Sequence, residues 1–492
     1  MGEGGTSAAA LTSPPLSSPP PIELRALQFN VWLDATKVKD GLELTASAIL
    51  DSNADVVSLN EVKNFWGNDF VSNLKKELHY QQEEREKQGE SQKYSQWYGN
   101  FPGNPHKLHI DADTAIISRY PVLEELVVYR TPENSIVRSL IEMSPRQPPV
   151  VVYSVHLEYR AYSCYLPRGY NSHSASFPGW NPVLAWQQRK ADSADTTFWA
   201  SPSFSYLVGN CLGTVYGLVV GDSTKSQDDL YPITDVDVIH QDNLSSGRPE
   251  AIEKILEDVE ALSRSNTHYR NNASGIMPVI IMGDFNEPST LDWTEDTKHT
   301  AGHNGVVYQW ETTRRLLNAG WVDSYRELHP NPLTHPGYTW PAAVKGKNNV
   351  REQITGWLRN ADERDRIDFI FYKNQATQNK EPLVSDGQRP SHIAPSLALH
   401  PVDAWLVGTP VIVVGDTLLD ESSKCDSSEM EAKTTTLAEC KYRNCKPTQD
   451  QYLLKVGSLW PSDHRAVMTI FELRSTTVSQ CSEHPKHPTS VE

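Results

Sequence analysis

Acidic, amide and imidazole side chains stand at the ends of several apolar segments of this sequence. The segment PVIIMGDFN at 278–286 is an apolar run that ends in Asp284 and Asn286. A single acid after a strand usually belongs to a turn or caps a helix, so one such case indicates little. The same pattern recurs along the chain at Asn30, Glu61, His156, Asp368, Asp463 and His464. If these strand ends converge, they form a polar site where α/β folds usually gather their functional residues.

Oxygen ligands dominate this set of side chains. Carboxylate and amide oxygens without cysteine suit a hard cation, Mg²⁺ or alternatively Mn²⁺, better than zinc. The sequence contains neither an HExxH zinc motif nor a GxSxG nucleophile motif. A cation held by carboxylates leaves room for water and a phosphate oxygen, and two histidines can stabilise the charge that develops on phosphate. The pattern therefore predicts metal-assisted hydrolysis of a phosphate ester.

Short runs rich in Val and Ile are the elements that must position these residues. They predict strands at 24–32, 55–62, 113–122, 149–158, 278–286, 366–374 and 465–473. Apolar residues at helical spacing predict helices over 248–265 and from 311 to at least Asn318, with Gly320 as the expected stop. This order of elements predicts a layered α/β architecture, and several strands are apolar on both faces, as in covered sheets.

One catalytic domain is expected to fill most of the chain, from residue 22 to residue 474. Three polar or Gly/Pro-rich segments interrupt the strand pattern and are interpreted as long loops or insertions without a core of their own: 80–109, 159–247 and 375–455. The Pro/Ser-rich stretch 1–21 is predicted to be a disordered tail, and 475–492 a C-terminal tail.

Charge and hydropathy narrow the class of partner. The chain of 492 residues has 45 basic and 62 acidic residues, a formal net charge of −17. Such a charge disfavours a protein that coats nucleic acid by neutralising phosphates, so a small phosphate ester or a lipid head group is favoured over nucleic acid. No apolar run is long enough for a membrane-spanning helix, and no protein partner can be inferred.

Cellular location stays open at this stage. The first residues lack the basic start and the apolar stretch of a secretory signal, so as written the cytoplasm is the default. Six cysteines and the glycosylation sequons at Asn243 and Asn272 leave secretion as an alternative.

A series of short motifs gives a family resemblance. QFNVW, LNEV, AIISRYPV, VHLE, GDFN, RIDFIF and SDHRAV, in this order, resemble the signature series of the endonuclease/exonuclease/phosphatase superfamily. The resemblance spans residues 22–473 apart from the three insertions. It implies a deoxyribonuclease I-like four-layer sandwich, in which two packed β-sheets are flanked by helices, with a divalent-metal site at one edge.

The resemblance also implies roles for the metal and phosphate ligands. Glu61 matches the glutamate that holds the metal, with Asn30 close by as a metal and phosphate partner. Asp463 matches an acid near the metal, and Asn286 matches a residue that contacts phosphate. From the residues alone, Asn30 could instead simply cap its strand.

The remaining matches concern proton transfer. Asp284 matches the acid that orients or activates the attacking water, and His464 the histidine beside the scissile phosphate; which of the two takes the proton is left open. Asp368 matches the aspartate that orients His464, although a surface ion pair with Arg364 or Arg366 is an alternative. His156 matches a second histidine, and Asp113 is a weaker match to the carboxylate that would orient it, or a strand cap.

In having a histidine at position 156, the chain resembles the nuclease and neutral sphingomyelinase branches of the superfamily. The inositol phosphatase branch usually carries a Cys-Asp-Arg signature where this chain has ERDRIDF, which disfavours that branch. The sequence therefore favours a metal-dependent phosphodiesterase. A nonspecific endonuclease, a phosphomonoesterase and an inactive binding module of the same fold are the alternatives.

Overall fold

A computed structural model gives the fold of the chain. The structure describes residues 22–62, 69–89, 96–101, 113–131, 134–145, 147–169, 232–265, 277–345, 352–354, 362–374, 396–408, 412–414, 417–418, 445–447, 453–454 and 460–476. The predicted tail at 1–21, most of the tail at 475–492 and the sequon at Asn272 lie outside these residues.

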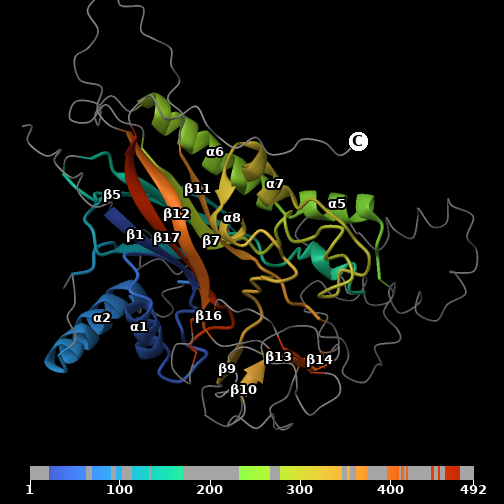
Figure 1. The fold of residues 1–492 in the computed structure, drawn as a ribbon, viewed down its shortest axis with the longest axis horizontal. Helices are drawn as coiled ribbons and strands as arrows, with labels where there is room; N and C mark the ends of the chain where they lie inside the picture. The colour runs from blue at the N-terminus through green and yellow to red at the C-terminus, as the bar shows by residue number, and fades with distance from the viewer. Residues whose placement is uncertain are drawn as a thin grey trace, which may run out of the picture.

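Two six-stranded sheets form the centre of the molecule (Figure 1). The first has the order β16 (Leu453–Leu454), β12 (Ser396–Val407), β17 (Ala466–Thr476), β1 (Ile22–Asn30), β2 (Val56–Asn60) and β3 (Thr114–Ser118). The second has the order β4 (Val122–Arg130), β5 (Ser135–Ile141), β6 (Val150–His156), β7 (Val279–Asp284), β11 (Asp368–Lys373) and β8 (Val322–Asp323). Each of the predicted strands is present.

Smaller elements complete the described chain. β9 (Ala343–Lys345) pairs with β10 (Glu352–Ile354), and β13 (Ile412–Val414) lies between β14 (Thr417–Leu418) and β15 (Cys445–Pro447). The helices are α1 (Gly41–Asp51), α2 (Phe70–Lys87), α5 (Val236–Ser245), α6 (Arg248–Ser265), α7 (Glu311–Asn318) and α8 (Ser324–Leu328), with a 3₁₀ turn, η2, at Ser163–Tyr165. None of the helices in the described ranges is long and apolar enough to cross a membrane.

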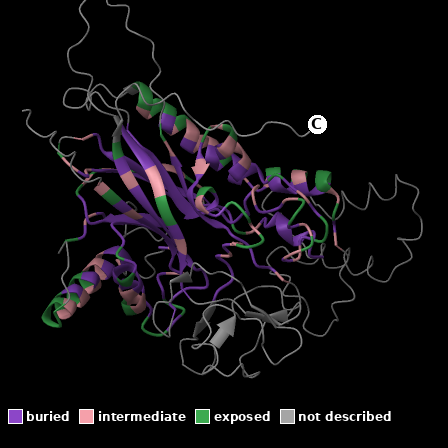
Figure 2. Cartoon of the chain, viewed as in Figure 1, coloured by how far each residue is buried: buried purple, intermediate pink, exposed green. Residues whose placement is uncertain are grey.

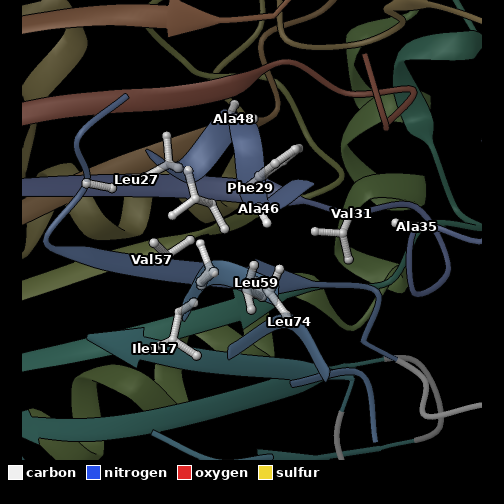
Figure 3. Close-up of a cluster of buried hydrophobic side chains, with 14 of the residues drawn as sticks. Leu27, Phe29, Val31, Ala35, Ala46, Ala48, Val57, Leu59, Leu74 and Ile117 are labelled. Atoms are coloured by element: carbon white, nitrogen blue, oxygen red, sulfur yellow. The ribbon is translucent and has the colours of Figure 1, made fainter. Parts of the chain in front are cut away.

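Helices cover the outer face of each sheet, so the molecule has four layers (Figure 1). On the first sheet, Leu27 and Phe29 of β1 pack with Ala46 of α1 and Leu74 of α2 (Figure 3). A second core fills the space between the sheets, and a third lies between the second sheet and the helices α6 and α7. Figure 2 shows buried strands inside and exposed residues on the outer sides of α1, α2 and α6. The predicted four-layer sandwich is confirmed.

Amphipathic spacing explains how the outer helices attach. In α6, Ala251, Ile252, Ile255 and Val259 recur at the helical period and are buried against the second sheet. The helix predicted from residue 311 ends at Asn318, and Gly320 follows it with a φ of 78°, a left-handed conformation that favours glycine.

Two of the predicted insertions contain elements of the main fold. Residues 396–407 of the segment 375–455 form β12, which pairs with β17 along its length. Pro401 and a bulge between Pro401 and Asp403 break the strand alternation there, which hid this strand from the sequence. Helix α2 runs on to Lys87, so the first part of the segment 80–109 is helical.

Both ends of the segment 159–247 contribute to a hydrophobic cluster that they share with the rest of the domain. Tyr162 and Leu166 from its start, and Val238 and Ile239 from α5, pack together with Trp293. Aromatic residues supply much of this cluster, and they show no clear helix or strand period in the sequence.

The sequon at Asn243 is not a surface site. Its side chain is fully buried, donates to Glu287 and accepts the backbone N–H of Glu311. An asparagine in this environment cannot carry a glycan in the folded protein.

Candidate active site

Polar side chains replace apolar ones at one end of the space between the two sheets. In β7, Ile280 and Met282 belong to the core between the sheets, and Asp284 is the next residue on that face. The side chains on one face of a strand recur at every second residue, so the face changes from apolar to polar at the strand end. The same change in the other strands produces a buried polar seam, which consists of Gln28, Asn30, Ser58, Asn60, Ser154, His156, Asp284 and Asp368.

Strand pairing places members of the polar seam in one row. Asp284 pairs with His156 in the parallel β6 and with Asp368 in the antiparallel β11. Asn30 and Asn60 pair in the facing sheet. Hydrogen bonds across the space between the sheets hold Asp284: Asn30 Nδ2 donates to Asp284 Oδ2 over 2.9 Å, and the Asp284 backbone N–H donates to Asn60 Oδ1 over 3.0 Å.

The Asp284 carboxyl group lies at the centre of the row and is almost fully buried. Its Oδ1 accepts the backbone N–H of Asn286 over 2.9 Å. Burial raises the pKa of Asp284 to about 6, against the opposing effect of the positive charge on His464. A carboxylate with a pKa in this range can accept a proton near neutral pH, which is the property that a general base needs.

His464 lies between two carboxylates. Its Nδ1 is 2.9 Å from Asp368 Oδ2, and its Nε2 is 3.7 Å from Asp284 Oδ2. Burial acts to lower the pKa of His464, but the charges of Asp368 and Asp284 outweigh it and raise the pKa to about 10. The ring is therefore an imidazolium at neutral pH, and both of its nitrogens are donors.

Asp368 has no ion pair with the arginines beside it in the sequence. Arg366 binds the buried Asp292 over 2.9 Å, and Arg364 binds Asp362 over 2.6 Å. The carboxylate of Asp368 instead faces the histidine, as an orienting residue would.

His156 forms a second pair of the same kind on the other side of Asp284. Its Nδ1 is 2.7 Å from Asp113 Oδ2, and its Nε2 is 3.8 Å from Asp284 Oδ2. Both imidazoles thus direct Nε2 toward the same carboxylate oxygen, and each is held on its Nδ1 side by an aspartate.

Glu61 and Asp463 add negative charge beside this centre. Glu61 is half-buried, and its carboxylate accepts Asn30 Nδ2 over 3.3 Å and the Leu33 N–H over 3.0 Å. Asp463 is buried, and its Oδ1 has no hydrogen-bond partner among the described residues. Burial raises the pKa of Asp463 to about 7, and the neighbouring charge of Glu61 adds to this effect.

The carboxylates of Glu61 and Asp463 are suitable ligands for a hard divalent cation. An unpartnered buried carboxylate oxygen is costly, and the repulsion between Glu61 and Asp463 disappears when a cation lies near both. Asp284, Asp368 and His464 also place one potential ligand atom each within 4.8 Å of one another, so this group could hold a metal ion too. In that group, however, His464 and Asp368 already bond to each other, which leaves Glu61 and Asp463 as the better pair.

The amide of Asn30 has a defined orientation. Its Oδ1 accepts the Trp32 backbone N–H over 2.9 Å, which fixes the oxygen on that side because an N–H cannot donate to the amide nitrogen. Its Nδ2 therefore faces Asp284, Glu61 and His464. This geometry suits Asn30 as a donor to phosphate better than as a metal ligand.

A left-handed turn follows Asn30. The residues from Trp32 to Ala35 have φ angles between 50° and 57°, and Glu61 has a φ of 59°. Non-glycine residues adopt this conformation at an energetic cost, which is often found at functional sites. Here the turn directs the Leu33 N–H to the Glu61 carboxylate, and no signal in the sequence indicated it.

Asn286 lies at the end of β7 in the same left-handed conformation, with a φ of 48°. Its Nδ2 donates to the Leu157 backbone carbonyl over 3.0 Å, which ties the ends of β6 and β7 together. Asn286 lies two residues after Asp284, and its side chain is shown in this structural hydrogen bond. Its contact with phosphate stays a prediction.

Residues outside the predicted set also hold the site. Ser462 donates to the Asn30 carbonyl over 2.6 Å and accepts the His464 N–H over 3.1 Å. Thr339 accepts the Asp368 N–H over 3.2 Å. Gln28 could have been found from the sequence, because it precedes Asn30 by two residues and so shares its face of the strand.

Comparison with known proteins decides the family. The model of the Endonuclease/Exonuclease/phosphatase family matches residues 27–464. The chain belongs to this family. The resemblance seen in the motif series is thereby confirmed, and since members of the family are phosphoester hydrolases, hydrolase activity is supported.

The chain is also similar to individual proteins. An uncharacterised Caenorhabditis elegans protein, F14F9.5, is 36% identical over 117 residues, which cover 24% of this chain and 35% of that protein. A humanized D. rerio TDP2 is 12% identical, with a TM-score of 0.33, and the match covers 92% of this chain and 99% of that chain. The human Nocturnin catalytic domain with bound sulfate is 11% identical, with a TM-score of 0.32, and the match covers 92% and 95%.

Proposed function

We propose that this protein is a Mg²⁺-dependent phosphodiesterase that hydrolyses a small or lipid-like phosphodiester with an activated water molecule. Family membership supports the hydrolase class, and the proposal adds the metal, the diester and the substrate class. Mn²⁺ is the alternative cation.

The arrangement around Asp284 carries the proposal. Its Oδ2 lies within 3.8 Å of Nε2 of both His156 and His464, and each of these rings is bonded to a second aspartate. A base flanked by two oriented imidazoles, of which His464 is protonated, provides for both halves of hydrolysis, removal of a proton from water and stabilisation of the leaving oxygen.

The proton states divide the work between these residues. Asp284, with a pKa of about 6, is mostly ionised at pH 7.5 and accepts the proton of the attacking water. His464, whose pKa of about 10 keeps it protonated, donates to a phosphate oxygen or to the leaving oxygen. Asn30 Nδ2 faces the same space and can donate to a non-bridging oxygen.

Glu61 and Asp463 would hold the metal ion. When bound, Mg²⁺ acts as a Lewis acid that polarises the phosphate and neutralises local negative charge. It also accounts for a phosphate substrate in a chain with a net charge of −17, because the positive field is then supplied locally.

A substrate panel tests the proposal. Bis-p-nitrophenyl phosphate, p-nitrophenyl phosphate, plasmid DNA and sphingomyelin should each be incubated with Mg²⁺ and with chelator. We expect Mg²⁺-dependent hydrolysis of a diester, with the monoester slower. Faster hydrolysis of the monoester would identify a phosphomonoesterase, cleavage of plasmid alone a nuclease, and no turnover on any substrate would support an inactive binding module.

A further inference from the structure

Gln28 lies in the part of β1 where the face between the sheets changes from apolar to polar. Leu24 and Ala26 precede it on this face and belong to the core between the sheets, and Asn30 follows it. The Gln28 side chain is fully buried. An apolar residue at this position would therefore continue the core, so the amide needs a separate explanation.

The amide nitrogen of Gln28 has two acceptors in the polar seam. It donates to Asp368 Oδ1 over 3.2 Å, across the space between the sheets, and to Asn60 Oδ1 in the neighbouring strand. The amide oxygen, Oε1, is buried and has no hydrogen-bond partner within the described part of the chain. The protein thus buries a polar side chain whose two bonds both reach residues of the site, and leaves its other polar atom unmatched.

Both acceptors bear on the reacting groups. Asp368 uses its other oxygen, Oδ2, for His464 Nδ1, so the bond from Gln28 fixes the rotation of the carboxylate. Asn60 Oδ1 accepts the Asp284 backbone N–H, so the same amide also supports the acceptor that holds Asp284. One side chain of the first sheet therefore contacts the supports of both Asp284 and His464.

We propose that Gln28 is a positioning residue that locks the Asp368 carboxylate onto His464 and, through Asn60, fixes the backbone of Asp284. The expected effect of Gln28 on kcat rests on the proposed hydrolytic function. The expected effect of Gln28 on the Asp368–His464 hydrogen bond does not, because this bond can be observed without turnover.

Kinetics of the full chain test the effect of Gln28 on the reaction. Gln28→Met keeps the side-chain length and removes both donors, and we expect kcat for bis-p-nitrophenyl phosphate to fall ~10-fold with little change in KM, as for other residues that orient a reacting group. Thr469→Val is the matched control, because Thr469 is fully buried in β17, the strand beside β1, and bonds to Ser324 outside the polar seam. It should leave kcat unchanged.

A double-mutant cycle with Asp368→Asn separates positioning from a general loss of structure. If Gln28 acts through Asp368, Gln28→Met has a smaller effect on kcat in the Asp368→Asn background than in the parental protein, and the effect that stays is due to the contact with Asn60. Equal effects in both backgrounds, or an unchanged kcat in the single variant, would overturn the proposal. If Gln28→Met does not fold, Gln28→Asn replaces it, since the shorter amide cannot reach both acceptors and should give the same loss.

Proton NMR supplies a readout that is independent of activity. The N–H of His464 bonded to Asp368 should give a downfield imidazole signal, identified by its loss in His464→Gln. We expect Gln28→Met or Gln28→Asn to shift or broaden this signal, and Thr469→Val to leave it in place. An unchanged signal in the Gln28 variants would refute positioning even if the parental protein hydrolysed none of the substrates.

Discussion

The Asp284 carboxylate lies 3.7 Å from the Nε2 atom of His464, although Asp284 ends a strand of the second sheet and His464 precedes a strand of the first. The pKa of Asp284 is raised to about 6 by burial, and the pKa of His464 is raised to about 10 by its carboxylate neighbours in spite of burial. At neutral pH one member of the pair is a base and the other an acid. This difference assigns opposite proton-transfer roles to two groups in one site.

Asp284→Asn should reduce kcat for a phosphodiester by ~10²–10⁴-fold, because it removes the group that accepts the proton of water. The fold should survive. Burial raises the pKa of this carboxyl above its unfolded value of 3.8, so protonation of Asp284 favours the folded state. This contribution to the free energy of unfolding is complete below pH 3.8 and is lost as the pH rises through about 6. In chelator at pH 7.5, thermal unfolding of the variant should therefore occur no lower than that of the parental protein. A much lower Tm would mean that Asp284 is chiefly structural.

Glu61→Gln should weaken metal binding. Mg²⁺ should raise the Tm of the parental protein, because a ligand that binds only the folded state stabilises it. This rise should shrink or vanish in Glu61→Gln, with activity restored only at higher Mg²⁺. Glu43→Gln is a matched control, because Glu43 is an exposed residue of α1. Equal Mg²⁺-induced shifts in all three proteins would place the metal elsewhere.

Much of this site could be predicted because strand alternation and residue chemistry are local properties. Asp284, Asp368 and His156 are visible as polar residues at the ends of apolar strands, and pairing then aligns them in one row. Glu61 and His464 follow the same pattern, and the motif series added the roles expected of them.

What could not be predicted depends on long-range contacts and backbone conformation. The orientation of Asn30 follows from the Trp32 N–H, in a left-handed turn whose residues carry no glycine signal. Strand β12 was missed because Pro401 interrupts its alternation. The Gln28 contact with Asp368 joins two sheets and leaves no local pattern.

Asp113→Asn should reduce kcat by ~10-fold or more through His156, because the carboxylate fixes the ring on its Nδ1 side. The loss should be small in a His156→Ala background, since the ring on which Asp113 acts is then absent. Comparable losses with and without His156 would show that Asp113 acts in another way. The measurement is kcat for bis-p-nitrophenyl phosphate in the four proteins of the cycle.

His303 should make the fold sensitive to acid. It stacks on Trp293 with ring centroids 3.8 Å apart, and burial, with the nearby Arg168, lowers the pKa of His303 to about 3. The unfolded chain takes up a proton at this residue below pH 6.5, and the folded chain does not. The contribution of His303 to the free energy of unfolding is therefore complete above pH 6.5. It falls as the pH is lowered toward 3, by up to about 1.4 kcal/mol per pH unit.

Urea unfolding in chelator between pH 7 and pH 5 measures this slope. His303→Phe keeps an aromatic ring against Trp293 without a titrating group, so its free energy of unfolding should fall less steeply with acid. His79→Phe removes an exposed histidine and should retain the parental slope. Parallel curves for all three proteins would show that His303 is protonated as easily in the folded state as in the unfolded chain.

The most direct test of the central claim is the rate of bis-p-nitrophenyl phosphate hydrolysis at pH 7.5, with Mg²⁺ and with chelator, in the parental protein and in Asp284→Asn. We predict turnover by the parental protein with Mg²⁺, and background rates with chelator or with the variant. Equal rates for the two proteins, or a parental rate that the chelator leaves unchanged, would contradict a metal-dependent hydrolytic centre at Asp284.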